Sequence, residues 1–194
     1  MKFLFASDSF KGTLSSRRTA ELLTLAAQEV FPGCECSSME MADGGEGTTD
    51  AVIAAAGGSK VTVNVHGPLL EKRQACYGKL DEKTAVMEMA AGSGLTLVPD
   101  DKKDPRKTTS YGTGEMIKDA LEKGFTEISI AIGGSATNDG GMGCMIALGV
   151  RFLDESGKEL PGCGEDLIRV RDIDISGLDQ RVKNCTFTIM CDVT

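Results

Sequence analysis

The stretch EISIAIGGSATNDGGMGCMIALGV, residues 127–150, contains a strand, a glycine-rich loop and a helix in direct succession. Its apolar opening predicts a buried strand over residues 127–132, and its second half predicts a helix over residues 142–150. The loop and the first turn of the helix, residues 133–143, have five glycines in eleven residues. Ordered glycine costs about 0.5–1 kcal/mol relative to alanine, so such a loop is typical of backbone that a ligand approaches closely. The order strand, loop, helix therefore predicts an α/β fold that binds a ligand beyond a strand end.

Strands and helices alternate through the rest of the chain, which is typical of α/β domains with largely parallel or mixed sheets. We expect strands at residues 2–6, 36–41, 61–65, 75–80, 84–89 and 186–193, and helices at residues 16–30, 48–56 and 114–123. The pattern changes where valines begin to alternate with polar residues at Val61. The prediction is therefore two α/β domains, a Rossmann-like residues 1–62 and a second domain of residues 63–194.

The strand expected at residues 186–193 has no helix after it in the sequence. An α/β sheet normally covers each strand with a following helix. We therefore expect the first domain to be incomplete and the chain to be part of a longer protein; a natural short domain is the alternative.

The overall charge argues against several classes of partner. The 194 residues include 29 acidic and 21 basic side chains, a net charge of −8, without a basic stripe. Nucleic acid and anionic lipid both require clustered Lys and Arg, so we predict that the protein binds neither. The sequence has no run of about 18 apolar residues and no secretory leader, which predicts a cytoplasmic protein.

Two further loops join a predicted strand to a predicted helix. The first, residues 7–13, places Asp8, Ser9 and Lys11 within a few positions. Lys11 and the N-terminus of the following helix suit an anion, while Asp8 suits a hydroxyl proton or Mg²⁺. The alternative for this loop is a helix cap with no ligand.

The second loop, residues 41–49, reads MADGGEGTT. Gly44 and Gly45 allow backbone amides to converge on a phosphate, and Asp43 and Glu46 offer hard oxygen ligands for a cation. Carboxylates alone would repel a phosphate, so this combination predicts Mg²⁺ between the two charges. A turn that uses glycine only for its positive φ is the alternative.

A weaker candidate is TTSYGTG, residues 108–114, just before another predicted helix. Ser110 and Gly112 would there face phosphate oxygens. Other signatures are absent from the sequence, which has no GxxxxGK[ST], no complete GxGxxG after a strand, no HRD or DFG, and no GxSxG. These absences argue against Walker A proteins, protein kinases and Ser-His-Asp hydrolases.

The loops together resemble the bacterial glycerate kinase family that forms 2-phosphoglycerate. The resemblance rests on DSFKGTL at residues 8–14, MADGGEGT at 41–48, GGSATNDGG at 133–141, TSYGTGE at 109–115 and CDVT at 191–194. It implies ATP-dependent phosphorylation of D-glycerate with Mg²⁺, in a cleft between two α/β domains. It also implies a missing C-terminal half, because members of this family are longer and complete their first domain with chain that returns after the second.

Phosphoryl transfer depends mainly on positioning and charge neutralisation, which gives each candidate an expected role. Lys11 would contact the transferring phosphate or the glycerate carboxylate. Gly133, Gly134 and Ser135 would present donors to anionic oxygens, and Asn138 would orient nearby carboxylates. The sequence leaves open which acid holds Mg²⁺ and which accepts the substrate hydroxyl proton among Asp43, Glu46, Asp139 and Asp192. The rival function is an inactive half-chain that acts only as an anion-binding or interaction module.

Overall fold

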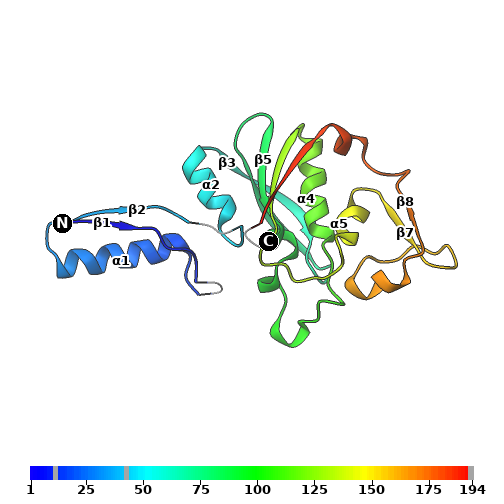
Figure 1. Cartoon of the computed structure of the whole chain (residues 1–194), viewed down its shortest axis with the longest axis horizontal. Helices are drawn as coiled ribbons and strands as arrows, with labels where there is room; N and C mark the ends of the chain where they lie inside the picture. Colours follow the sequence, from blue (N-terminus) through cyan, green and yellow to red (C-terminus); the bar gives the residue numbers. More distant parts are fainter. Residues whose placement is uncertain (11–12, 42–43, 192–194) are drawn as a thin grey trace.

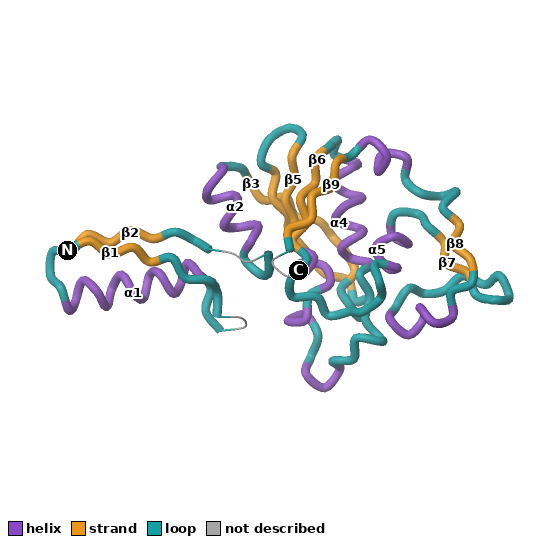
Figure 2. Tube along the Cα trace, viewed as in Figure 1, coloured by secondary structure: helices purple, strands orange, loops and turns teal. Residues whose placement is uncertain are grey.

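The structure, a computed structural model, describes residues 1–10, 13–41 and 44–191. It separates into a small N-terminal unit and a larger body (Figure 1). The N-terminal unit consists of β1 (Lys2–Phe5), α1 (Ser16–Val30) and β2 (Glu35–Ser38). β1 and β2 pair in parallel, and α1 runs alongside them (Figure 2).

Local signals set the limits of the N-terminal unit. The Ser15 side chain caps α1 by accepting a hydrogen bond from the Arg18 N–H at 3.1 Å. The rings of Phe3 and Phe31 lie 5.4 Å apart between their centres, whereas Leu4, the next residue on β1, is 65% exposed. Successive residues of a strand face opposite sides, so one face of this two-stranded sheet is covered and the other is open.

The body is built on one five-stranded sheet, in the order β3-β4-β5-β6-β9. Its strands are β3 (Ser59–His66), β4 (Lys72–Lys79), β5 (Thr84–Glu88), β6 (Glu127–Ala131) and β9 (Thr186–Met190). β3, β4 and β5 pair antiparallel, while β5, β6 and β9 run parallel. The carboxyl ends of the three parallel strands therefore meet at one edge of the sheet.

Helices cover both faces of this sheet. The α-helices of the body are α2 (Thr48–Ala56), α3 (Met89–Ser93), α4 (Tyr111–Glu122) and α5 (Met142–Ala147), and α5 packs on α4. Ile53 of α2 and Val86 of β5 meet beside Gly78, whereas Met87 packs in the same cluster as Met116 of α4. Because neighbouring residues of β5 point to opposite faces, α2 and α4 lie on opposite sides of the sheet.

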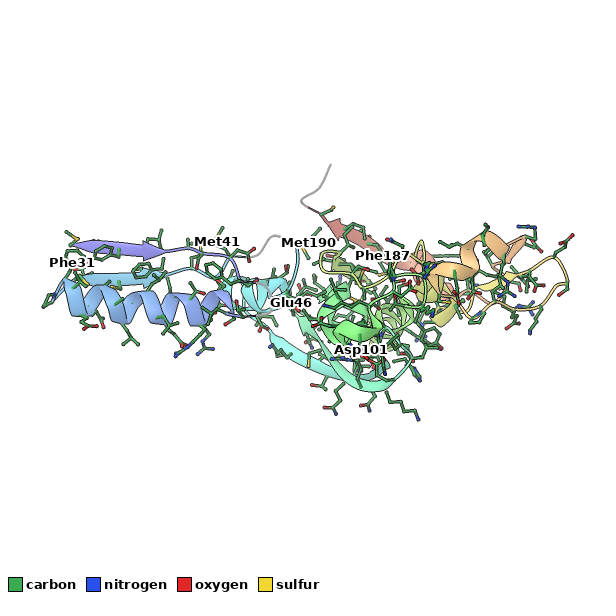
Figure 3. The ribbon with its side chains drawn as sticks, turned by 90° about the horizontal axis from the view of Figure 1, so that it is seen from below. Phe31, Met41, Glu46, Asp101, Phe187 and Met190 are labelled. Carbon is green, nitrogen blue, oxygen red and sulfur yellow. The ribbon has the colours of Figure 1, made fainter. Side chains whose placement is uncertain are left out.

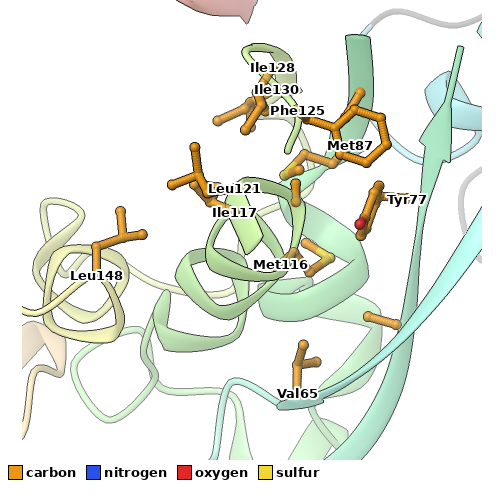
Figure 4. Packing of buried hydrophobic residues seen from close by; sticks show 13 residues of the cluster. Val65, Tyr77, Met87, Met116, Ile117, Leu121, Phe125, Ile128, Ile130 and Leu148 are labelled. Atoms are coloured by element: carbon orange, nitrogen blue, oxygen red, sulfur yellow. The ribbon is translucent and has the colours of Figure 1, made fainter. Parts of the chain in front are cut away.

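The main core lies between the sheet and α4 (Figure 4). Tyr77, Met116 and Ile128 are fully buried there. The Tyr77 hydroxyl donates to Asp119 Oδ2 at 2.8 Å, and burial together with this contact raises the pKa of Tyr77. This core fixes β5 and β6, whose carboxyl ends hold the loops of interest.

A peripheral segment connects α5 to β9. It contains the antiparallel pair β7 (Arg151–Leu153) and β8 (Asp172–Asp174) and two 3-10 helices, Gly164–Arg169 and Gln180–Asn184. Two more 3-10 helices, Leu95–Leu97 and Asp100–Lys102, follow α3. Among the described residues, no helix combines the length and apolar character needed to cross a membrane.

The expected α/β class with parallel and mixed sheets is confirmed. The boundary expected near residue 62 falls inside β3, and the chain passes from the first sheet to the second between β2 and α2. The alternating valines mark an edge strand of the second sheet, and α2 already packs on that sheet. The sequence did not predict α3, β7 or β8, which are all short.

Candidate active site

The loops after β6 and before α2 touch at the carboxyl edge of the sheet. The Gly133 N–H donates to the Gly44 carbonyl oxygen at 2.9 Å. A Cβ at Gly133 would lie 2.8 Å from both this oxygen and the Gly45 Cα, which is closer than side chains tolerate. The end of β9 joins them, since the Ile132 N–H donates to the Met190 carbonyl at 3.3 Å. Two loops that the sequence predicted separately therefore form one structure, which we call the joined loops (residues 44–48 and 132–141).

Glu46 lies at this junction. Its Oε1 accepts a hydrogen bond from the Thr96 hydroxyl at 2.6 Å, and the Leu95 N–H donates to the Gly134 carbonyl at 2.8 Å. The segment after α3 therefore fastens both members of the joined loops. Figure 3 places Glu46 and Met190 where the N-terminal unit meets the body.

The acids predicted to bind a cation are only partly described. Asp43 and Asp192 lie outside the described residues, and Glu46 is paired with Thr96. Within residues 1–10, 13–41 and 44–191, no group of three His, Cys, Asp or Glu side chains is placed to hold a metal ion. Mg²⁺ binding by Asp43 and Glu46 therefore stays a prediction.

The loop after β1 borders a cavity of about 560 Å³. Asp8 Oδ1 accepts a hydrogen bond from the Ser9 N–H at 2.7 Å. The hydroxyls of Ser7 and Ser9 are buried without a hydrogen-bond partner in the described part of the chain. Buried polar groups are nearly always satisfied, so these hydroxyls suit a ligand oxygen. Lys11, predicted to contact phosphate from this loop, lies outside the described residues.

Residues from both the N-terminal unit and the body line this cavity. Its lining includes Ser9, Thr13 and Arg17 from the N-terminal unit, and Glu46, Gly47 and Lys60 from the body. Lys60 Nζ pairs with Asp50 Oδ1 at 2.6 Å, and this contact raises the pKa of Lys60. The volume lies in the range of about 300–1,000 Å³ that is typical of sites for drug-sized ligands.

Glu88, the last residue of β5, is a functional candidate that the sequence did not reveal. Its Oε1 accepts a hydrogen bond from the Thr49 N–H at 2.7 Å, and the Gly47 amide is a second donor. Burial raises the pKa of Glu88, while these two amides oppose the shift. The carboxylate thus occupies the N-terminus of α2, where a negative charge is favourable. A single acidic residue at a strand end forms no sequence motif. Only its position at the edge of the folded sheet therefore identifies Glu88 as a candidate.

We expect the free energy of unfolding to depend on pH through Glu88. Its folded pKa lies above the ordinary value of 4.5. Between these two pKa values, the folded protein therefore binds more protons than the unfolded chain does. The stability from this group is complete below about pH 4.5 and is lost as pH rises through the raised pKa. Urea unfolding should therefore show that the free energy of unfolding of Glu88→Gln, relative to that of the unmodified chain, rises as pH increases. A difference between the two that stays constant with pH would contradict this assignment.

The TTSYGTG segment is buried and its polar groups are used internally. The Ser110 hydroxyl donates to Asp139 Oδ2 at 2.7 Å and accepts from the Cys144 N–H at 2.9 Å. A Cβ at Gly112 would lie 2.0 Å from the His66 carbonyl oxygen. The Ser110 hydroxyl and the Gly112 position are thus engaged inside the protein, and the phosphate contacts predicted for these two residues stay predictions. These residues allow the start of α4 to pack closely against the end of β3.

Asp139 belongs to the same internal network. Besides the Ser110 hydroxyl, its Oδ2 accepts from the N–H groups of Ser110 at 2.7 Å and Gly143 at 3.1 Å. Its Oδ1 accepts from the Gly141 N–H at 3.0 Å. The residue is 2% exposed. These contacts indicate that Asp139 holds the joined loops to α4 and α5, and its predicted role as base or metal ligand stays a prediction.

Ser135 and Asn138 remain on the outer side of the same loop. Among the residues that the structure describes, the Ser135 hydroxyl bonds to the backbone of Thr137, at 3.2 Å to its carbonyl and 3.2 Å from its N–H. Asn138 is exposed and its N–H donates to the Pro105 carbonyl at 3.3 Å. By contrast, the Gly133 N–H is already taken by Gly44, whereas the N–H groups of Gly134 and Ser135 make no backbone hydrogen bond within the described part of the chain.

Comparisons with known proteins point to one family. The sequence pattern of the glycerate kinase family matches residues 3–194. The chain is 51% identical to Glycerate 2-kinase of Escherichia coli (strain K12) and 47% identical to Glycerate kinase of Bacillus subtilis (strain 168). Each match covers 100% of this chain and 51% of the relative.

A solved structure gives the same result for the fold. A crystal structure of a protein assigned as glycerate kinase 2 from Salmonella typhimurium LT2 superposes with a TM-score of 0.79 at 46% identity. The match covers 100% of this chain and 52% of that one. The chain therefore spans about half the length of the relatives that it matches.

Proposed function

Because this chain belongs to the glycerate kinase family, we propose that it carries the site of an ATP-dependent kinase that converts D-glycerate to 2-phosphoglycerate. The observation that supports this most is the contact between Gly133 and Gly44, which joins two glycine-rich loops at one sheet edge. Phosphoryl transfer requires fixed donors around a developing negative charge, and glycine backbone at strand ends supplies them.

We assign the role of phosphate donor to backbone amides of the joined loops that make no backbone hydrogen bond within the described residues. The amides of Gly134 and Ser135 lie shortly after β6, which ends at Ala131, while the Gly133 amide holds Gly44 in place. Lys11 would add a cation from the loop after β1, as its sequence context predicts. Removal of one preorganised donor typically costs about 3 kcal/mol of transition-state stabilisation, so a few such groups account for a large share of catalysis.

The acids at this edge suit Mg²⁺ by their chemistry. Glu46 lies in the joined loops, and Asp43 and Asp192 directly precede Gly44 and follow Cys191 in the sequence. Carboxylate oxygens are the ligands that hard cations prefer. When bound, the ion would supply positive charge for the phosphates of ATP, for which the cavity of about 560 Å³ beside Ser9 has sufficient volume.

We also propose that polypeptide corresponding to the other half of the relatives completes the site. The chain covers 51% of the Escherichia coli relative. Its N-terminal unit leaves large apolar side chains exposed, including Leu4 at 65% and Leu25 at 62%. Contiguous exposed apolar surface normally marks a contact with further protein.

A coupled assay that follows ADP release from ATP, Mg²⁺ and D-glycerate tests this function. One arm contains the chain alone, and another adds the C-terminal half of the Escherichia coli relative. We expect glycerate-dependent ADP release in the completed arm, with 2-phosphoglycerate as the product identified by ³¹P NMR. Glycerol, which lacks the carboxylate, is the control acceptor. Binding of ATP·Mg by calorimetry without turnover in either arm would favour the anion-binding module instead.

A further inference from the structure

A second, smaller cavity lies on the outer side of the GGSATNDGG loop. Its volume is about 180 Å³, and it is bounded by this loop and by the segment between residues 95 and 105. Leu95, Val98 and Ala136 provide apolar surface, whereas Lys103, Ser135 and Asn138 provide polar groups. The role assigned to this part of the loop above concerns backbone amides, whereas the side chains of Lys103, Ser135 and Asn138 at this cavity have no role yet.

Backbone hydrogen bonds hold the two walls of the smaller cavity together. The Asn138 N–H donates to the Pro105 carbonyl at 3.3 Å, and the Leu95 N–H donates to the Gly134 carbonyl at 2.8 Å. A cavity whose walls are already joined does not have to be organised by its ligand. Preformed cavities of this kind are the usual form of small-molecule sites.

Lys103 gives the smaller cavity a positive charge. Its Nζ pairs with Asp100 Oδ1 at 2.6 Å, but the Asp100 side chain is 94% exposed, and such exposed pairs are weak. A ligand carboxylate can therefore take the place of Asp100. The acid that lines the cavity, Asp104, is bound by Arg106 Nε at 2.9 Å and Nη2 at 2.8 Å, so its charge is already compensated.

Size and chemistry together select the occupant. Sites for drug-sized ligands measure about 300–1,000 Å³, so a volume of about 180 Å³ excludes a nucleotide and suits a three-carbon acid. We propose that this cavity is the subsite for the acceptor, a small hydroxy acid whose carboxylate binds Lys103 and whose hydroxyls meet Ser135 and Asn138. This inference rests on the proposed function, since it places the acceptor of that reaction.

The larger cavity, of about 560 Å³, lies at the other member of the joined loops, residues 44–48. Glu46 and Gly47 line the cavity of about 560 Å³, and Ser135 and Asn138 line the smaller one. Both cavities therefore border the joined loops.

Titration of the ¹⁵N-labelled chain with sodium D-glycerate tests the subsite without any turnover. We expect shifts of the amide signals of residues 103 and 135–138, and none with glycerol. Lys103→Gln should weaken D-glycerate binding about 10- to 100-fold, because it removes a charge-assisted contact. Lys103→Arg should keep the affinity within about threefold, since the charge remains. Lys102→Gln, an exposed neighbour outside the cavity lining, is the matched control and should bind as the unmodified chain does.

The outcomes separate this inference from the proposed function. Glycerate binding that is lost in Lys103→Gln, without any ATP-dependent product, would support the subsite and contradict the kinase activity. Turnover of ATP and glycerate with an unchanged KM for glycerate in Lys103→Gln would support the kinase and overturn the subsite. Absence of glycerate-induced shifts at residues 135–138 in the unmodified chain would also overturn it.

Discussion

Replacement of Asp139 by alanine is expected to lower the free energy of unfolding by about 3–5 kcal/mol. The carboxylate is 2% exposed and accepts hydrogen bonds from the amides of Ser110, Gly141 and Gly143 and from the Ser110 hydroxyl. Alanine would leave these donors buried without an acceptor, and each such group costs about 1–3 kcal/mol. Urea unfolding with an unchanged m-value measures the loss.

Asp81→Ala is the matched control for this prediction. Asp81 Oδ1 also accepts from two backbone amides, those of Lys83 at 2.7 Å and Thr84 at 2.8 Å, but in an exposed turn. Water can replace it there, so we expect a loss of about 1 kcal/mol or less. Equal losses for the two variants would contradict the buried network. If Asp139 acted directly on substrate, Asp139→Asn would remove turnover while leaving unfolding unchanged, which is the opposite of the expected result.

Replacement of Gly133 by alanine is expected to reduce glycerate-dependent ADP release about 100-fold, because a displacement of about 1 Å at a catalytic site has effects of this size. The new Cβ would lie 2.8 Å from the Gly44 carbonyl oxygen and from the Gly45 Cα. Both atoms are backbone, so no flexible side chain can move aside and the joined loops must separate. Overpacking of this kind costs about 1–3 kcal/mol of stability, which leaves the chain folded.

Gly124→Ala controls for the loss of stability. Gly124 has a φ of +91° and open space around its Cβ position, so alanine there introduces backbone strain of about 1 kcal/mol far from the loops. We expect normal turnover in this variant. Affinity for ATP·Mg, measured by calorimetry, should fall in Gly133→Ala and not in Gly124→Ala. Retention of more than a third of the turnover in Gly133→Ala would show that the loop contact does not position the phosphate.

The sequence predicts the parts of the fold that depend on local signals. The bounds of α1 and α2 match the prediction because Ser15 caps one helix and Gly57 ends the other. The pairing of β6 with β9 has no such signal, since it depends on the packing of distant segments. The domain boundary near residue 62 stays a prediction, and it falls inside β3 because alternation at Val61 indicates an edge strand but not the sheet to which that strand belongs.

The sequence also predicts the glycine-rich loops but not their purposes. Gly133 and Gly112 look alike in sequence, yet one joins two loops at the sheet edge and the other lets α4 pack against the His66 carbonyl. Both positions need an absent Cβ, so composition cannot separate ligand approach from close packing. Glu88 was missed because its partners, Thr49 and Gly47, belong to a helix far away in the sequence.

The parallel pairing of the central sheet has a consequence for the order of folding. Thr84 pairs with Glu127, and Glu127 pairs with Thr186, so each ladder joins segments that are remote along the chain. Such high contact order slows folding, because chain entropy is lost before the contacts form. The amide cluster at the strand ends exists only after these steps. An anion that binds this cluster would stabilise only the fully assembled sheet. Anion binding and the last stage of folding would then form one coupled equilibrium.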